Sequence, residues 1–429
     1  MFVAVARRVD PEGAGQARLL VVGGSARSRG VVCSASYEAR EFGLHAGMPI
    51  SRAVRLCPDA MYVPVPGQAC QEAHRAIRGV LEQWAPVVEP ASVDEFYLDL
   101  TGTERLYRDQ PLETTARRIR EAVAGATGFT LSIGGGTNRL IAKMAAERAK
   151  PRSGSGAGGI LIVPPGQESR FMRERALAEI PGVGPRLQET LRRRGLSQVE
   201  QALAFDRKSL TGWLGQATGQ WLYRAIRGEG AGIVSRPANK SISRETTFSR
   251  DLAGDDAIEA RLLRLVTELA AELRSDGLVT RCVTVKLRDH DFRTRQAGRT
   301  LTQPLATDRA LFQVARELLG DLRRRRRAPA RLVGVCFSSL QSGKEPIQLS
   351  LLTDAPPEEP ERDRRLARAV DRITHRLGAG AIRPARLAAE PKARLHLGFQ
   401  PPRAAGPLSL EREIRKRHRK VSGDSTRSG

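Results

Sequence analysis

Two adjacent carboxylates, Asp94 and Glu95, precede a segment, 96–100, in which Phe, Leu and Leu occupy every second position. A two-residue period predicts a half-buried strand, so the carboxylates would lie at its entry. Neighbouring carboxylates repel each other unless a cation lies between them, and Mg²⁺ takes such oxygen ligands together with substrate phosphates. Two ions held in this way stabilise both the attacking and the leaving oxygen of a phosphoryl transfer. A solvated Asp-Glu pair in a loop is the simpler interpretation of the same residues.

Three other side chains have the chemistry of phosphate contacts. Tyr37 and Arg40 are three residues apart and therefore share one face of a helix. A guanidinium beside a phenol hydroxyl suits a triphosphate, although an ordinary surface pair fits as well. Lys150 ends a predicted helix just before Pro151 and a glycine-rich loop. It could contact a phosphate or simply place a cation at a helix C-terminus.

The run Ile-Pro-Gly-Val-Gly-Pro at 180–185 precedes another predicted helix. It is similar to a helix-hairpin-helix turn, in which Gly182 and Gly184 would expose backbone N–H groups to a DNA phosphate. Such a contact binds the DNA backbone without reading its sequence. A plain turn between two helices is the alternative.

Basic residues are concentrated at 281–302, where six Lys and Arg stand against two acids. Lys286 and Arg288 share one face of a strand by parity, and a basic sheet face suits a phosphate backbone. Arg293 and Arg295 follow across a predicted turn. The five arginines at 323–327 could add to this surface, but a charge run is more often a solvated helix end.

The overall charge points to the same kind of partner. Lys and Arg number 71 and Asp and Glu 47, a net charge of +24, which favours a polyanion such as nucleic acid. A composition bias toward arginine would also raise the charge. No apolar run reaches the length of a membrane span and no signal peptide is recognisable, so a cytoplasmic protein is expected. The five cysteines are scattered, which suits reduced thiols rather than zinc ligands or disulfides.

Stretches of different character must position these residues. Residues 1–164 mix strands and helices without a strict βαβ rhythm, which predicts an α+β sheet domain. Residues 165–230 are helical in pattern. After an exposed linker at 231–240, four strands and two helices are expected within 241–340. The extension at 341–429 ends in a basic tail, 403–429, whose composition predicts disorder.

The individual elements follow from periodicity and turn residues. In the first stretch, strands are expected at 18–24, 30–36, 129–133 and 160–163, a pair of strands interrupted near Pro90 at 87–100, helices at 71–84, 112–124 and 138–149, and a turn at the glycines 134–136. In the fourth stretch, strands are expected at 241–248, 281–288, 297–303 and 331–338, and helices at 255–275 and 308–322.

In order along about residues 1–350, several motifs resemble those of the Y-family DNA polymerases, in the DinB branch. The motifs are 31–43, 47–49, 55–58, 88–99, 138–143, Lys150-Pro151, the hairpin at 180–185 and 240–248. The resemblance implies a multidomain α+β fold, the right-hand polymerase. It implies a ferredoxin-like palm (1–10 and 68–164), small fingers (11–67), a helical helix-hairpin-helix thumb (165–230), the linker (231–240), a separate α/β little finger (241–340) and a C-terminal extension (341–429).

The resemblance also implies an activity: template-directed, low-fidelity DNA synthesis past damaged bases, without proofreading. Asp94 and Glu95 would be the metal ligands and the catalytic carboxylates for two Mg²⁺ ions. Tyr37, Arg40 and Lys150 would contact the triphosphate of the dNTP. Primer-template DNA would lie on the thumb hairpin and the basic strands of the little finger. Gln348–Leu352 looks like a sliding-clamp peptide, and a monomer is expected.

The N-terminus departs from the family pattern. The family has an Asp-x-Asp in its first strand, followed by two aromatic residues, which align with Met1 and Phe2 here. Phe2 would then be the steric gate that leaves no room for a ribose 2′-OH. The Asp-x-Asp would lie upstream of Met1, Asp10 comes too late to replace it, and Ala6 stands where the family has a glutamate.

Two accounts of this departure compete. Either the protein begins one strand earlier than Met1, or the chain is a degenerate polymerase that binds DNA as an accessory of damage tolerance. The intact Asp94, Glu95, Tyr37, Arg40 and Lys150 favour the first account. An in-frame Asp-x-Asp encoded just upstream would support it.

Overall fold

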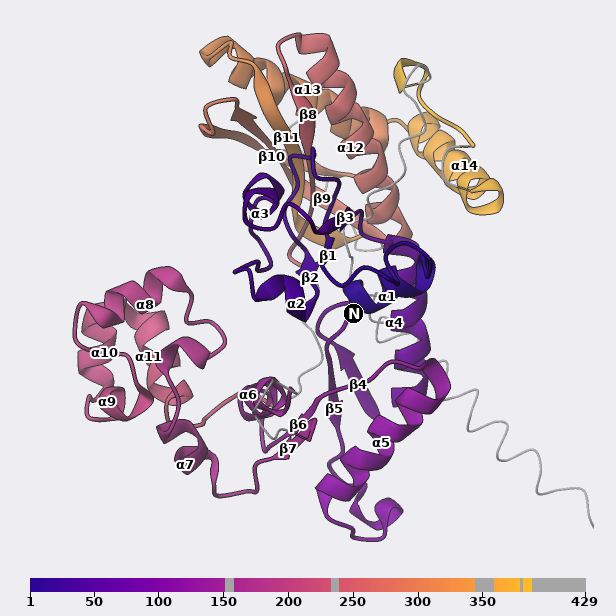
Figure 1. Ribbon diagram of the computed structural model, residues 1–429. Helices are drawn as coiled ribbons and strands as arrows, with labels where there is room; N and C mark the ends of the chain where they lie inside the picture. Colours follow the sequence, from indigo (N-terminus) through magenta and orange to yellow (C-terminus); the bar gives the residue numbers. More distant parts are fainter. Residues whose placement is uncertain (151–157, 233–238, 344–358, 379–380, 388–429) are drawn as a thin grey trace, which may run out of the picture. The chain divides into compact units, whose positions relative to one another are not determined.

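The computed structural model describes residues 1–150, 158–232, 239–343, 359–378 and 381–387 (Figure 1). The chain divides into two compact units. The first unit comprises 1–17 and 65–236, and the second comprises 18–64 and 237–396, each as far as it is described. Among the described helices, none combines the length and the apolar character that crossing a bilayer requires.

Two pairs of short strands form the sheet part of the first unit. The strands β4 (Val87–Pro90) and β5 (Phe96–Asp99) are antiparallel, and β6 (Ile133–Gly135) runs parallel to β7 (Ile160–Ile162). The helices of this part are α1 (Phe2–Val9), α4 (Gly67–Leu81), α5 (Leu112–Thr127) and α6 (Arg139–Ala149). Apolar side chains of α4 and α5, among them Ile77 and Ile119, form one core with the inner face of the strands because they recur at helical spacing.

Gly134 and Gly135 lie in a strand, so the turn predicted at 134–136 is wrong for these two residues and the strand predicted at 129–133 starts later. A Cβ on Gly134 would lie 2.0 Å from the backbone nitrogen of Ala146 and 2.3 Å from the carbonyl oxygen of Ala142 in α6. The glycine therefore permits a close approach of strand and helix rather than a reversal of the chain.

The rest of the first unit is helical, as its sequence predicts. Its α-helices are α7 (Glu168–Arg173), α8 (Pro185–Arg192), α9 (Val199–Leu203), α10 (Arg207–Leu214) and α11 (Gln216–Ala225), and a 3₁₀ turn, η2, covers Leu177–Glu179. Fully buried Ile180, Leu191, Leu210 and Leu222 bring these short helices around one core.

The second unit contains a small sheet with the strand order β2-β1-β3. Its strands are β1 (Leu20–Val22), β2 (Ser34–Ala35) and β3 (Met61–Val63), and its helices are α2 (Tyr37–Arg40) and α3 (Ile50–Leu56). Strand β2 is much shorter than the strand predicted at 30–36. The three residues of β1 are fully buried, which explains their unbroken apolar run.

A four-stranded antiparallel sheet with the order β10-β9-β11-β8 makes up most of the second unit. The strands are β8 (Ser241–Leu252), β9 (Leu278–Asp289), β10 (Thr294–Leu305) and β11 (Ala330–Ser342), with helices α12 (Asp255–Ser275) and α13 (Asp308–Arg325). The four strands and two helices predicted for this stretch are therefore present. Val283, Val285 and Leu287 point toward the helices, which cover one face of the sheet (Figure 1).

The extension contributes a helix that the sequence did not lead us to expect, α14 (Glu361–Leu377). Asp371 accepts two hydrogen bonds, of 2.7 and 2.8 Å, from Arg274 of α12. Glu359 accepts hydrogen bonds of 2.6 and 2.5 Å from the backbone nitrogens of Ala306 and Thr307 at the start of α13. The basic tail and the peptide 348–352 lie outside the described residues.

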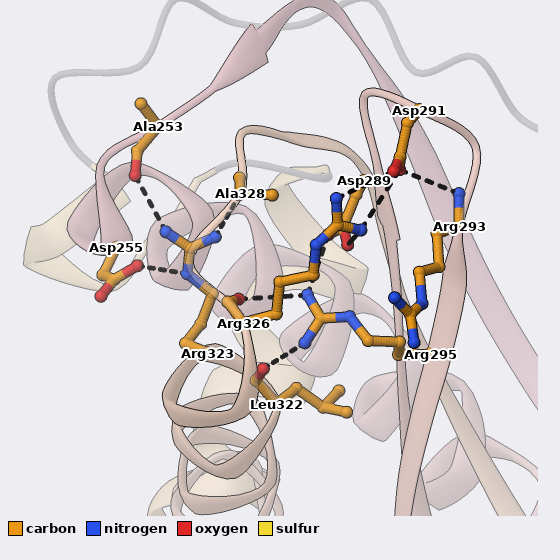
Figure 2. A network of polar contacts seen from close by, with 10 residues as sticks. All are labelled: Ala253, Asp255, Asp289, Asp291, Arg293, Arg295, Leu322, Arg323, Arg326 and Ala328. Carbon is orange, nitrogen blue, oxygen red and sulfur yellow. Dashed lines mark hydrogen bonds and ion pairs between the residues drawn. The ribbon is translucent and has the colours of Figure 1, made fainter.

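Two members of the arginine run at 323–327 turn inward instead of joining a basic surface (Figure 2). Arg323 is 6% exposed, forms an ion pair of 2.5 Å with Asp255 and donates to the carbonyl oxygens of Ala253 and Ala328. Arg326 pairs with Asp289, a fully buried carboxylate that also pairs with Arg295. Buried carboxylates require such partners, because an unpaired buried charge is strongly destabilising.

Substitution of Asp289 by Ala should therefore destabilise the second unit by about 3–5 kcal/mol, because it leaves Arg295 and Arg326 without their shared carboxylate. Chemical denaturation followed by circular dichroism measures the loss. The exposed i,i+3 pair of Asp321 and Arg324 provides the control, and Asp321→Ala should change stability by less than about 1 kcal/mol. Equal effects of the two variants would contradict the role given to Asp289.

Candidate active site

The predicted carboxylates lie in the tight turn that joins β4 to β5. The carbonyl oxygen of Glu95 accepts hydrogen bonds from the backbone nitrogens of Ala91 at 2.8 Å and Ser92 at 3.2 Å. Ser92 Oγ donates to Asp94 Oδ1 at 2.9 Å. The side chains of Asp94 and Glu95 are 41% and 50% exposed, so both are accessible to a ligand.

A lysine ammonium lies against Glu95, and the nitrogen of Met1 lies near Asp94. Lys143 Nζ of α6 is 2.7 Å from Glu95 Oε2, and the backbone nitrogen of Met1 is 3.7 Å from Asp94 Oδ2. Burial alone would lower the pKa of Lys143, but the hydrogen bond and the charge of Glu95 outweigh it and raise that pKa. Lys143 therefore stays charged and neutralises part of the repulsion between the carboxylates.

Arg139 holds α6 in the position from which Lys143 reaches Glu95. Its guanidinium is 3.2 Å from Glu89 Oε2 in β4 and lies 4.3 Å from the ring centroid of Tyr97 in β5. Arg139 and Lys143 are four residues apart and thus on one face of the helix. Both residues lie in the family motif at 138–143, and the sequence indicated no role for either of them.

His74 of α4 fixes the turn from the other side. Its Nδ1 donates to the carbonyl oxygen of Val93 at 2.8 Å, and its ring stacks on Phe96 with centroids 4.7 Å apart. Only 2% of the residue is exposed, and this burial lowers its pKa. His74 was not predicted as a site residue, although it stands on the apolar face of the helix, four residues after buried Cys70.

The predicted steric gate, Phe2, lies in the first turn of α1. Together with Met1 it packs against the cluster of Val5, Cys70 and Val93. Because Val93 directly precedes Asp94, the structure brings Phe2 and the carboxylate turn into one neighbourhood.

The proposed triphosphate contacts are divided between the two units. Tyr37 and Arg40 share α2 of the second unit, where the guanidinium lies 5.3 Å from the phenol ring and the tyrosine is 69% exposed. Arg40 Nε donates to the carbonyl oxygen of Ala35 at 3.0 Å. Lys150 ends α6 in the first unit and pairs with Glu147. It follows Lys143 by seven residues, two helical turns on one side of α6.

The predicted hairpin glycines lie between η2 and α8. Gly182 has φ +104°, and a Cβ there would be 2.8 Å from the Trp221 ring, so a glycine is required on both counts. Gly184 is the N-cap residue of α8, which has Pro185 in its first turn and no side-chain cap. The backbone N–H groups at this helix start are thus not capped by the chain's own side chain.

Lys286 and Arg288 share the face of the four-stranded sheet opposite α12 and α13, as parity predicts. Lys286 Nζ lies 2.7 Å from Glu245 Oε2, and Arg288 Nε donates to Thr294 Oγ1 at 2.9 Å. Arg295 does not belong to this face, because its neighbours in register are the inward residues and it donates to the carbonyl oxygen of Leu322.

The donor set at 94–95 fits a divalent cation that shares its coordination with a substrate. In the described part of the chain, no group of three or more His, Cys, Asp or Glu is arranged to hold a metal. Two accessible carboxylates supply only part of a coordination shell, and phosphate oxygens supply the rest in the usual Mg²⁺ sites of nucleotide enzymes.

Comparisons with known proteins identify the family of the chain. Residues 1–147 match the impB/mucB/samB family and residues 239–351 match its C-terminal domain. A DNA polymerase IV of Dehalococcoides mccartyi is 33% identical over 388 residues, which cover 90% of this chain and 94% of the relative. One from Caulobacter vibrioides is 38% identical over 301 residues, 70% of this chain and 72% of the relative.

Solved structures give the same result. A Y-family DNA polymerase chimera has a TM-score of 0.68 at 26% identity and covers 79% of this chain and 96% of its own. DinB from Sulfolobus solfataricus has a TM-score of 0.51 at 26% identity, over 79% and 95% of the two chains. The fold and its structural neighbours thus define a DNA polymerase of the right-hand type. The chain belongs to the impB/mucB/samB family of Y-family DNA polymerases, as a DinB-type member, which confirms the resemblance and the predicted fold class.

The buried imidazole of His74 makes the stability of the first unit depend on pH. Because its folded pKa lies below the ordinary value of 6.5, only the unfolded chain gains a proton as the pH falls through that value. The contribution of neutral His74 to the free energy of unfolding is therefore fully present above pH 6.5 and is lost progressively as the pH falls below that value. His74→Gln should lose about 1 kcal/mol at pH 7.5, through the missing bond to Val93, and should show a flatter decline between pH 7.5 and 5.5. Denaturation curves at both pH values measure this, and parallel declines would exclude the role of His74.

Proposed function

We propose that Asp94 and Glu95 hold the divalent cation of a template-directed nucleotidyl transfer. The chain is a DNA-directed DNA polymerase of translesion synthesis, and polymerases of its family depend on a divalent metal, generally Mg²⁺. A primer 3′-OH attacks the α-phosphate of a dNTP, and pyrophosphate leaves. When bound, Mg²⁺, as two ions in this proposal, neutralises the charge that develops on the phosphate oxygens.

The neighbouring side chains position the carboxylates and the nucleotide. Lys143 holds Glu95 and limits the repulsion within the turn, and His74 fixes the backbone at Val93. In our proposal Lys150, Tyr37 and Arg40 contact the triphosphate. Phe2 excludes the ribose 2′-OH by bulk. The observation that carries this proposal is the accessible carboxylate pair of Asp94 and Glu95, supported from two helices.

We further propose that the DNA contacts follow the predicted domains. The thumb, at 165–230, would bind the duplex backbone through the amides near Gly182 and Gly184. The little finger, at 241–340, would bind it through Lys286 and Arg288. The peptide Gln348–Leu352, which lies outside the described residues, would dock on the sliding clamp. An insertion ternary complex of Dbh DNA polymerase, with a TM-score of 0.54 to this chain, is consistent with a primer-template and a nucleotide as ligands.

Asp94→Ala should lower primer extension in Mg²⁺ by about 10²–10³-fold, because it removes a charge that is placed to hold the cation. Single-nucleotide incorporation on a primer-template measures the effect. Asp99→Ala is the matched control, since Asp99 ends β5, the strand that follows the carboxylate turn, and accepts a hydrogen bond from the backbone nitrogen of Thr101. Unchanged extension by Asp94→Ala would disprove the assignment of the site.

The same assay separates the polymerase from the alternative, an accessory protein that binds DNA without catalysis. The accessory would show salt-sensitive DNA binding and no extension, even in a protein that includes any strand encoded upstream of Met1. The polymerase extends the primer, and Asp94→Ala lowers this extension whereas Asp99→Ala does not.

A further inference from the structure

The hairpin that joins β9 to β10 has an aromatic residue where its geometry favours glycine. The backbone nitrogen of Phe292 donates to the carbonyl oxygen of Asp289 at 3.0 Å, and that of Asp289 donates to the carbonyl oxygen of Arg293 at 2.9 Å. These bonds define a three-residue loop whose last residue is left-handed. Phe292 occupies this position with φ +65°. Glycine would adopt the conformation without steric conflict, so the backbone gives no reason for a phenylalanine.

The hairpin is rigid in spite of this strained residue. Arg326 lies 2.8 Å from Asp291 Oδ2 and 2.7 Å from Asp289 Oδ2, so one guanidinium ties the middle of the loop and the residue before it to the end of α13 (Figure 2). The hydrogen bond from Arg326 lowers the pKa of Asp291 to about 2, which keeps this tie charged over the physiological range. A fixed loop presents its side chains in one orientation, which is the usual requirement of a binding contact.

The ring of Phe292 is the part of the hairpin that the fold does not use. It is 63% exposed, and the guanidinium of Arg331 lies 4.5 Å from its centroid. Apart from Arg331, no ring contact of Phe292 is recorded among the described residues. A cation on one side leaves an aromatic surface available for another planar group.

Cations surround this ring on the hairpin. Arg288 stands directly across from Thr294 at the base of the loop, and Arg293 follows Phe292 and is exposed. The nearby acids, Asp289 and Asp291, are already paired with arginines. The surface around the ring is therefore basic, which favours a polyanion over an apolar protein surface.

We propose that Phe292 stacks on an unpaired nucleobase of bound DNA. Every base offers an aromatic face, and in a duplex both faces are covered by neighbouring bases, so the ring takes a base from a single-stranded part. Arg288, Arg293 and Arg331 supply the charge for the flanking phosphates. This inference rests on the DNA contact proposed above for Lys286 and Arg288, and it adds a contact for single strands.

Phe292→Gly tests the proposal without the risk of unfolding, because glycine relieves the left-handed residue. The variant should melt at the temperature of the parent or above it. Its affinity for a primer-template with a 5′ single-stranded overhang should fall by about 5–100-fold, whereas its affinity for a blunt duplex with the same paired region should stay unchanged. Fluorescence anisotropy at constant salt measures both affinities. A 2-aminopurine base placed at each overhang position reports stacking. Its fluorescence should be quenched where it stacks on Phe292 of the parent protein, and this quenching should be lost in Phe292→Gly.

Two conservative variants separate stacking from apolar contact. Phe292→Tyr keeps the ring and should bind the overhang like the parent, and Phe292→Leu keeps the bulk and should lose as much affinity as Phe292→Gly. The proposal is overturned if Phe292→Gly leaves overhang binding unchanged, if it weakens both DNAs equally, or if Phe292→Leu binds like the parent. Lys286→Ala tests the underlying DNA contact separately, because it should weaken binding of both DNAs. A failure of that result alone would reject the proposed DNA face and leave the result on stacking intact.

Discussion

Repulsion between two neighbouring carboxylates is the constraint that organises the first unit. Asp94 and Glu95 are adjacent in a tight turn, where two negative charges are unfavourable without compensation. Compensation comes from Lys143 on α6, and α6 is in turn held against both strands by Arg139. On the opposite side, α4 provides His74, which fixes the backbone of the turn without adding charge. Lys143, Arg139 and His74 thus keep the turn in place while Asp94 and Glu95 stay accessible.

Not all of the basic residues that give this protein its positive net charge are available to bind a polyanion. The chain carries +24, but several arginines of the second unit are used within the fold. Arg274, Arg295 and Arg323 are mostly buried and hydrogen-bonded to carboxylates or to backbone carbonyls. These arginines join helices to strand ends, where backbone carbonyls lack partners. Only the basic residues that are not used within the fold can bind DNA. The number of basic residues alone therefore does not locate the DNA-binding surface.

Local patterns predicted the parts of the fold that local physics determines. The alternation along β9 and β11 and the helical spacing of α12 and α13 gave the four strands and two helices, because each pattern reports a face buried against the same core. Asp94 and Glu95 were predicted as site residues because two adjacent carboxylates already indicate a cation site. Gly134 was misinterpreted, because a glycine serves a turn and a close contact equally well. Helix α14 was missed because its arginine-rich composition concealed the spacing of Leu366, Ile373 and Leu377. His74, Lys143 and Arg326 act on partners distant in sequence, which no local pattern indicates.

The contact of Gly134 with α6 has a consequence for how the protein can change. The strand and the helix meet backbone to backbone, with no side chain between them that could grow or shrink. Lys143 lies on this helix, so the backbone contact at Gly134, rather than side-chain packing, determines how far Lys143 lies from Glu95. Only glycine fits at position 134, so this one residue maintains the distance between Lys143 and Glu95 when residues elsewhere on the surface are substituted.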